Sequence, residues 1–231
     1  EASFSNTSGQ HNVALGQSAN YAITTGGSNV GVGSQALRFN TTASNNTAVG
    51  YQAVYTNTTG TANVGLGAYA LLSNTTASNN TAVGYHSLLD NTTGANNIAV
   101  GNYALSNNTT SNSNVAMGYA ALETNTTGAN NVAIGSTALL SNTTASNNTA
   151  VGYQAGYSTT TGGSNTFIGR VSGYSSLAVE NNSALGAASL YTNTTGQYNV
   201  AIGSASLYSN TTATNNTAVG HQAGYSFTTG G

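Results

Sequence analysis

The sequence predicts an all-β protein, a parallel β-solenoid (β-roll) built from 13 copies of a 17-residue coil. Three observations predict this class: a glycine recurs every 17 residues without insertion or deletion, a short apolar run precedes it, and polar turn residues separate the runs. A short repeat cannot bury an apolar face alone, so stacked neighbouring coils are expected to supply the core. We call the recurring residues the repeat glycines: Gly16, Gly33, Gly50, Gly67, Gly84, Gly101, Gly118, Gly135, Gly152, Gly169, Gly186, Gly203 and Gly220.

The positions around each repeat glycine are equally regular. Asn always stands four residues before it, an aliphatic residue or Met directly before it, and Ala or Ser three residues after it. A polar turn such as Asn57-Thr58-Thr59-Gly60 follows. Short β-branched runs bounded by Gly, Asn, Ser and Thr are typical of strands and turns, whereas a helix would need apolar residues at i, i+3, i+4 and i+7. The glycines and the aliphatic residues before them are therefore expected to hold each coil.

A second period of 34 residues overlies the first. Tyr51, Tyr85, Tyr119 and Tyr153 each follow a repeat glycine, and smaller residues follow the glycines between them. This alternation of bulky and small side chains predicts that neighbouring coils interdigitate.

The composition excludes several functional classes. Charged residues make up 3% of the chain, against about 25% in an ordinary soluble domain. A net charge of −2 cannot form a basic groove, which argues against nucleic-acid binding. The absence of cysteine excludes disulfides and thiolate metal sites, and no apolar run approaches the roughly 18 residues of a membrane span.

Residues 1–231 are expected to form a single continuous solenoid domain, uncapped at both ends. The sequence opens in mid-repeat at Glu1 and stops in mid-repeat at Gly231. Solenoid ends carry unpaired strand edges, which isolated molecules normally cover with polar caps. The pattern predicts either a piece of a longer chain or end-to-end stacking on neighbouring copies, and both favour a fibre. Frayed but soluble ends are the remaining alternative.

The polar turns carry candidate N-glycosylation sites of the form Asn-x-Ser/Thr. Asn-Thr-Thr recurs seven residues after the repeat glycine, and Asn6-Thr7-Ser8 lies in the same register. One hypothesis is a rod that carries glycan at regular spacing, on at least some of the turn asparagines; the alternative is that Asn and Thr favour turns and form side-chain hydrogen bonds along the stacked coils. The candidates are Asn6, Asn40, Asn57, Asn74, Asn91, Asn108, Asn125, Asn142, Asn193 and Asn210, with further matches at Asn45, Asn79, Asn107, Asn147, Asn181 and Asn215.

The sequence does not predict an enzyme, a cofactor or a metal site. His11, His86 and His221 occupy different repeat positions, and the four acidic residues are scattered. Catalysis and metal binding both need convergent groups. A threonine array that orders water as ice is a distant third interpretation, because Thr58-Thr59 would turn only one threonine outward per coil.

Two motifs resemble known families. The phrase Asn-Asn-Thr-Ala-Val-Gly-Tyr-Gln-Ala at 147–155, nearly repeated at 215–223, resembles tandem repeats of phage tail-fibre-like and large bacterial surface proteins. The element Asn-x-Ala-Ile/Val-Gly resembles the head repeats of YadA-like trimeric autotransporter adhesins. The resemblance implies a β-roll fibre outside the cell, often trimeric, with structural or adhesive duty. The 17-residue unit departs from the adhesin heads, which leaves open whether copies trimerise or stack end to end.

The sequence therefore predicts a structural subunit of an extracellular, glycosylated filament or surface fibre, located at a cell or virion surface and partnered by further copies of itself. The alternative hypothesis is a binding module, an adhesin or tail-fibre shaft that recognises host glycans through exposed Tyr and Asn. The least regular copy, 170–182, is the one non-repeating stretch that could localise such binding.

Overall fold

The computed structural model describes residues 3 and 5–229 and confirms the parallel β-solenoid. The described part contains no helix and thirteen strands of three residues each, one per coil. Every strand begins directly after an asparagine and ends directly before a repeat glycine. The strands are β1 (Val13–Leu15), β2 (Val30–Val32), β3 (Thr47–Val49), β4 (Val64–Leu66), β5 (Thr81–Val83), β6 (Ile98–Val100), β7 (Val115–Met117), β8 (Val132–Ile134), β9 (Thr149–Val151), β10 (Thr166–Ile168), β11 (Ser183–Leu185), β12 (Val200–Ile202) and β13 (Thr217–Val219).

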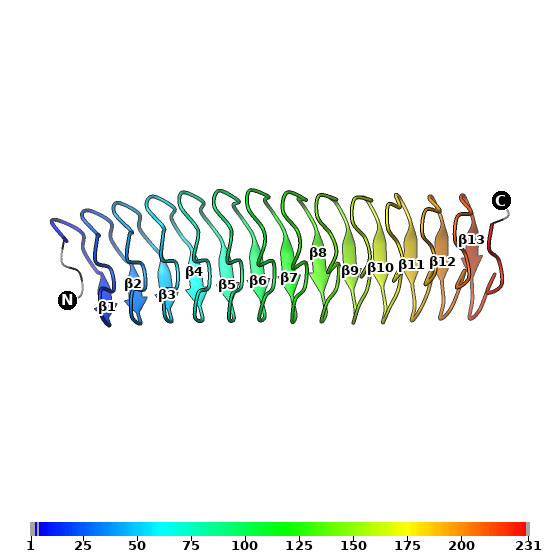
Figure 1. Ribbon diagram of the computed structural model, residues 1–231, viewed down its shortest axis with the longest axis horizontal. Coiled ribbons are helices and arrows are strands. Elements are labelled where there is room, and N and C mark those ends of the chain that lie inside the picture. Colours follow the sequence, from blue (N-terminus) through cyan, green and yellow to red (C-terminus); the bar gives the residue numbers. More distant parts are fainter. Residues whose placement is uncertain (1–2, 4, 230–231) are drawn as a thin grey trace. The chain divides into compact units, whose positions relative to one another are not determined.

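The chain forms two compact units, Glu1–Ser113 with β1–β6 and Asn114–Gly231 with β7–β13. Within each unit the strands follow one another in sequence order, joined by turns (Figure 1). Each strand pairs in parallel with the next at an offset of 17 residues, so that Thr47 lies beside Val64 and Val49 beside Leu66. Equivalent residues of successive coils therefore lie side by side.

The core of each coil is narrow and is filled by small and branched side chains. Side chains alternate across a strand, so the middle residue, such as Ala48, points inward and is fully buried. Ala53 and Val54 after the strand complete this layer, and leucine takes the place of Val54 in most other coils, as at Leu71 and Leu105. Because the coils stack, these inward side chains recur in every coil of a unit and form a core that excludes water.

One coil departs from this pattern and is compensated locally. Phe167 occupies the inward strand position that Ala or Gly holds in the other coils, and it is fully buried. The positions where other coils carry leucine are Gly156 and Gly173 on either side of its ring. A Cβ on Gly173 would lie 2.3 Å from Phe167 Cδ1, and one on Gly156 would lie 2.9 Å from Phe167 Cδ2. The phenyl ring therefore fills the volume that two leucines leave.

The repeat glycines adopt a backbone conformation that other residues avoid. Gly118 has φ +135°, and a Cβ placed on it would lie 2.6 Å from the carbonyl oxygen of Gly135 in the next coil. The missing side chain thus allows the backbones of successive coils to approach at this corner. This close contact gives a physical reason for glycine at the position.

The in-register stacking also aligns tyrosine rings in the second unit. Adjacent rings are nearly parallel, with centroids 4.9–5.2 Å apart. Partial burial raises the pKa of the Tyr174 hydroxyl, and the charges of ionised Tyr157, Tyr191 and Tyr153 raise it further. This tyrosine ladder consists of Tyr157, Tyr174, Tyr191, Tyr208 and Tyr225.

We predict that alkaline pH destabilises the second unit through this ladder. Because the folded state raises the pKa of Tyr174, its contribution to stability is present below the pKa of an unfolded tyrosine, about 10, and is lost as the pH rises through the folded value. Denaturant unfolding should be measured at about pH 8 and about pH 11. The free energy of unfolding should fall less between these pH values for Tyr174→Phe than for the unchanged chain. Tyr198→Phe, at an exposed tyrosine outside the ladder, is the control. An equal fall in the free energy of unfolding in all three proteins would contradict the prediction.

Candidate functional site: asparagine ladders and outward faces

The turn asparagines point into the coil rather than toward solvent. Their side chains are fully buried at Asn40, Asn57, Asn74, Asn91, Asn108, Asn125, Asn142, Asn193 and Asn210. In a representative turn, Asn57 Nδ2 donates to the carbonyl oxygen of Gly60 at 2.9 Å and to Oδ1 of Asn40 in the preceding coil at 2.8 Å. The second bond repeats along the stack, as between Asn74 Nδ2 and Asn57 Oδ1 at 2.8 Å. These residues form what we call the turn-asparagine ladder.

This geometry corrects the prediction that the turn asparagines carry glycan. The sugar of an N-glycan is attached to Nδ2, the atom that each of the nine residues buries and uses as a donor. A sugar there is incompatible with the folded coil, so the hydrogen-bonded ladder, the alternative interpretation of these turns, describes the nine residues. Asn6 differs: its side chain is exposed, although Nδ2 donates to the Gly9 carbonyl at 3.0 Å.

A second ladder is formed by the asparagine that precedes each strand. Asn63 donates its backbone N–H to Asn46 Oδ1 at 2.9 Å, and its Nδ2 donates to the carbonyl oxygen of Ala77 at 2.8 Å. Asn74 Nδ2 donates to the same Ala77 oxygen at 3.0 Å. The two ladders therefore converge on one carbonyl per coil. Buried amides with all partners satisfied fix a single arrangement, because an unpaired amide in a low dielectric is costly.

The turn-asparagine ladder is interrupted in the second unit. Thr159 and Ser176 replace asparagine in two successive coils, and both are fully buried. Asn142 Oδ1 then has no donor, and the hydroxyls of Thr159 and Ser176 have no partner. Each orphaned buried group costs about 1–3 kcal/mol, so this stretch is a weak point of the coil stack.

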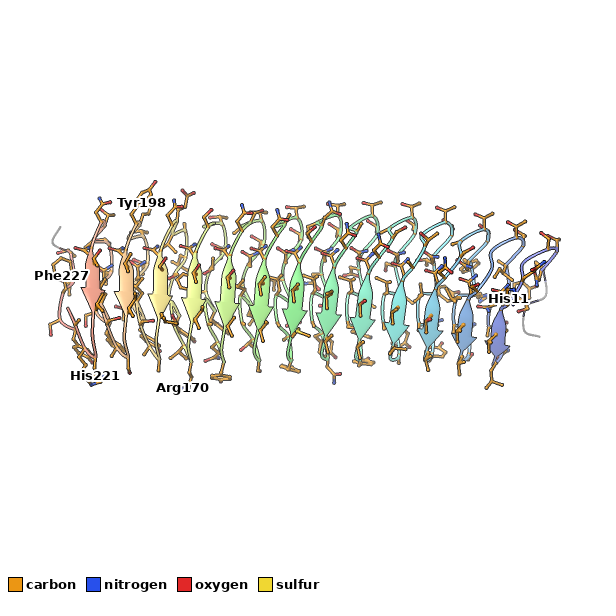
Figure 2. All side chains as sticks on the ribbon, turned by 180° about the vertical axis from the view of Figure 1, so that it is seen from behind. His11, Arg170, Tyr198, His221 and Phe227 are labelled. Carbon is orange, nitrogen blue, oxygen red and sulfur yellow. The ribbon has the colours of Figure 1, made fainter. Side chains whose placement is uncertain are left out.

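The exposed sequons lie at different positions of the repeat. Asn45, Asn79, Asn147, Asn181 and Asn215 stand five residues before a repeat glycine, and all five are exposed, as is Asn107 elsewhere in its coil. Tyr198 shares the register of these five and lies at the upper edge in Figure 2, opposite Arg170 and His221. Exposure separates these acceptor asparagines from the buried turn asparagines.

The outward face of each strand carries an aliphatic residue or Met at its third position, whereas its first position is aliphatic in some strands and Thr or Ser in others. The first and third strand residues both point away from the core. Many of these side chains are exposed, which is unusual for contiguous aliphatic residues on a soluble monomer. We call them the aliphatic face; its exposed members include Val13, Leu15, Val49, Leu66, Ile98, Met117, Ile134, Leu185, Ile202 and Val219.

The few ionisable groups do not converge. Among the described residues no three of His, Cys, Asp and Glu lie together in a metal-binding arrangement. His86 instead stacks on Tyr85, with ring centroids 3.9 Å apart, and Arg38 Nη1 donates to the Tyr55 hydroxyl at 3.2 Å. Partial burial raises the pKa of Glu123. The described part of the chain also contains no helix long and apolar enough to cross a membrane.

The irregular copy 170–182 keeps the geometry of the other coils. Leu177, which stands where threonine is usual, accepts hydrogen bonds at its carbonyl from the backbone and the hydroxyl of Thr160. Its side chain is exposed, whereas Val179 two residues later is fully buried. The stretch therefore keeps the inter-coil hydrogen bonding of the other coils, but two of its inward residues differ: Gly173 replaces the usual leucine and Ser176 replaces the turn asparagine.

We predict that Thr159→Asn stabilises the protein. The new Nδ2 can donate to Asn142 Oδ1, and the new Oδ1 can accept the Ser176 hydroxyl proton, which relieves three orphaned groups. The free energy of unfolding should rise by about 1–2 kcal/mol, measured by urea unfolding monitored by circular dichroism. Thr161→Asn places the same residue on the exposed surface of that coil and should change stability by less than about 0.5 kcal/mol. A destabilised Thr159→Asn protein would overturn this account of the ladder.

Expression in a host with N-linked glycosylation should separate the two classes of sequon. We expect glycopeptide mapping by mass spectrometry to find sugar only on exposed acceptors such as Asn45, Asn79 and Asn147, with buried Asn57 and its equivalents unmodified. Asn96 and Asn130 are exposed at the same repeat position but lack the downstream hydroxyl, so they serve as internal controls. Sugar on Asn57 in folded protein would contradict the buried ladder.

No family model, curated protein or solved structure matches this chain. The resemblance to surface-fibre repeats therefore depends on the quoted motifs alone. The functional argument therefore uses the outward surfaces of the coils and the asparagine ladders.

Proposed function

We propose that the protein is a structural subunit of an extracellular filament or surface fibre. The observation that carries this proposal is the aliphatic face, which repeats coil after coil on a chain with almost no charge. Contiguous exposed apolar surface of this kind marks an interaction site. The resemblance to fibre repeats supports the extracellular location.

The hydrogen-bonded ladders suit a protein that must resist tension. Each coil is joined to the next by backbone hydrogen bonds and by buried asparagine bonds. The turn threonines add a third series, as where Thr58 Oγ1 donates to the Thr75 carbonyl at 3.0 Å. Because every series links one coil to the next, tension along a unit is shared among many bonds.

A second copy of the chain is the partner that this surface fits best. The strand residues that form the aliphatic face include no charged side chain. Association through this face therefore buries apolar area without burying an unpaired charge. The face also repeats at the strand spacing of about 4.8 Å, and another copy carries the same spacing. Ridges and gaps of two copies can therefore match along the whole contact, whether the copies form a dimer, a trimer or a larger bundle.

Glycan on the exposed acceptors is compatible with this assembly. Asn79 and its equivalents precede the strand and lie outside it, whereas the aliphatic face is formed by strand residues such as Leu66. Sugar would hydrate a surface that lacks the charge on which most soluble proteins rely. The proposal therefore keeps a glycosylated fibre and moves its candidate sugar carriers to the exposed sequons.

Substitutions on the aliphatic face test the fibre proposal. We expect the unchanged chain to self-associate in sedimentation velocity and electron micrographs, and Leu66→Lys to weaken association by tenfold or more, roughly 1.4 kcal/mol, by placing a charge on the contact. Val49→Thr with Leu66→Thr should act in the same direction without adding charge; Thr47 and Thr81 show that outward threonine fits these strands.

The control is Thr59→Lys, which adds the same charge to an exposed turn. It should leave self-association unchanged, and circular dichroism should show that all variants fold. A chain that stays monomeric at every concentration, or Leu66→Lys that assembles like the unchanged protein, would overturn the proposal.

A further inference from the structure

Five aromatic rings form a continuous cluster on the surface of the first unit. Tyr69 lies edge-on to Tyr51 and to Tyr85, with centroid distances of 5.2 and 6.1 Å. Tyr103 lies edge-on to Tyr85 at 5.6 Å and to His86 at 5.5 Å. We call these five residues the aromatic strip. It runs through consecutive coils, because its members follow successive repeat glycines by one or two residues.

The alternation of tyrosine in the sequence thus brings rings of adjacent coils into contact in this unit. The expected interdigitation is produced by two repeat positions together. Tyr51 and Tyr85 directly follow their glycines, and Tyr69 and Tyr103 stand one residue further on in the coils between and beyond them. Tyr69 and Tyr103 have φ of +60°, a backbone conformation that the equivalent residues Gln35 and Gln52 share.

The strip is held rigidly before any ligand arrives. His86 stacks on Tyr85 at an interplanar angle of 15°, and it also lies edge-on to Tyr69 at 5.1 Å. Edge-to-face and stacked contacts of this kind contribute about 0.5–1.5 kcal/mol each beyond area burial. A preorganised surface loses little conformational entropy on binding. Tyr51 and Tyr85 nevertheless remain 45% and 40% exposed, so ring surface is available to a partner.

The strip and its flanks carry polar groups but no Asp, Glu, Lys or Arg. Gln52 Nε2 donates to Gln35 Oε1 beside the first ring, and Asn102 Oδ1 accepts the backbone N–H of Tyr85 at 3.2 Å. None of the residues one or two places after the repeat glycines Gly33 to Gly101 is Asp, Glu, Lys or Arg. Phenol hydroxyls and amides can exchange hydrogen bonds with a ligand, and the lack of charge favours a neutral one.

The spacing of the strip favours a linear, repeating ligand. Tyr51 and Tyr85 are two coils apart, which corresponds to about 10 Å at the spacing of parallel strands. A disaccharide in an extended β-1,4-linked chain has a similar length. The C–H faces of pyranose rings pack on aromatic rings, while their hydroxyl groups require neighbouring hydrogen-bonding partners.

We propose that the aromatic strip binds a neutral, extended β-1,4-linked polysaccharide along the axis of the first unit. Alternate sugars pack against Tyr51 and Tyr85, and their hydroxyl groups bond to the flanking phenols and amides. The irregular copy 170–182 is not needed for this binding. The strip shares no residue with the aliphatic face, and this inference does not depend on the fibre proposal.

Binding to defined carbohydrates tests the proposal. Affinity electrophoresis through hydroxyethylcellulose should retard the protein, and calorimetry with cellohexaose should give a dissociation constant. Removal of both exposed rings in Tyr51→Ala/Tyr85→Ala should weaken binding by about tenfold per ring. Tyr69→Phe, which keeps the ring but removes one phenol, should weaken binding less than the loss of a ring does. Tyr198→Ala removes a tyrosine that is 54% exposed outside the strip, and it should bind like the unchanged chain.

Each other outcome overturns the proposal. Failure to bind either cellulose-type probe would refute it, as would equal binding by the double variant or equal loss in Tyr198→Ala. Equal retardation by amylose or by anionic alginate would show that the strip selects neither an extended nor a neutral chain. If the double variant alters sedimentation in the absence of sugar while no carbohydrate binds, the strip is a protein contact. The Leu66→Lys series reports on the fibre independently, so the two proposals can fail separately.

Discussion

The hydrogen bond from a buried asparagine in one coil to its counterpart in the next is the interaction on which the rest of the structure depends. In most coils two asparagine amide groups are removed from water, and each has a partner 17 residues away, as at Asn57 and Asn63. A single inserted residue would move those partners and leave buried donors and acceptors unpaired, at a cost of about 1–3 kcal/mol each. The strict 17-residue register is the consequence. The strand pairing, the packed interior and the stacked tyrosines all depend on it.

Fixing the interior in this way leaves the outward positions free to differ. Inward residues such as Ala48 and Asn57 have little latitude, because Ala48 lies beside glycine in both adjacent coils and Asn57 bonds to asparagine in both. Outward residues meet solvent or a partner and can change without disturbing the ladders. The aliphatic face and the aromatic strip are therefore two sets of outward residues on one frame, one suited to assembly and the other to a ligand.

Much of the fold could be predicted from the sequence, because the repeat period, the glycine and the alternating strand pattern are local signals. The direction of the turn asparagines could not, since Asn-Thr-Thr suits an exposed glycan acceptor and a buried ladder equally well. Burial of Asn57 decides between them. The aromatic strip could not be predicted as a site either: the 34-residue alternation of Tyr51 and Tyr85 is visible in the sequence, but their contact with Tyr69 joins two different repeat positions of adjacent coils.

The packing around Phe167 has a consequence for how such a gene can grow or shrink. Most coils share the same inward residues, so recombination between repeats can delete or duplicate one of them and leave a sound protein. Phe167 instead needs glycine both in its own coil, at Gly173, and in the coil before, at Gly156. A crossover that separated Phe167 from Gly156 would set its ring against a leucine. These two coils must be inherited as one block, a linkage imposed by the shape of a single side chain.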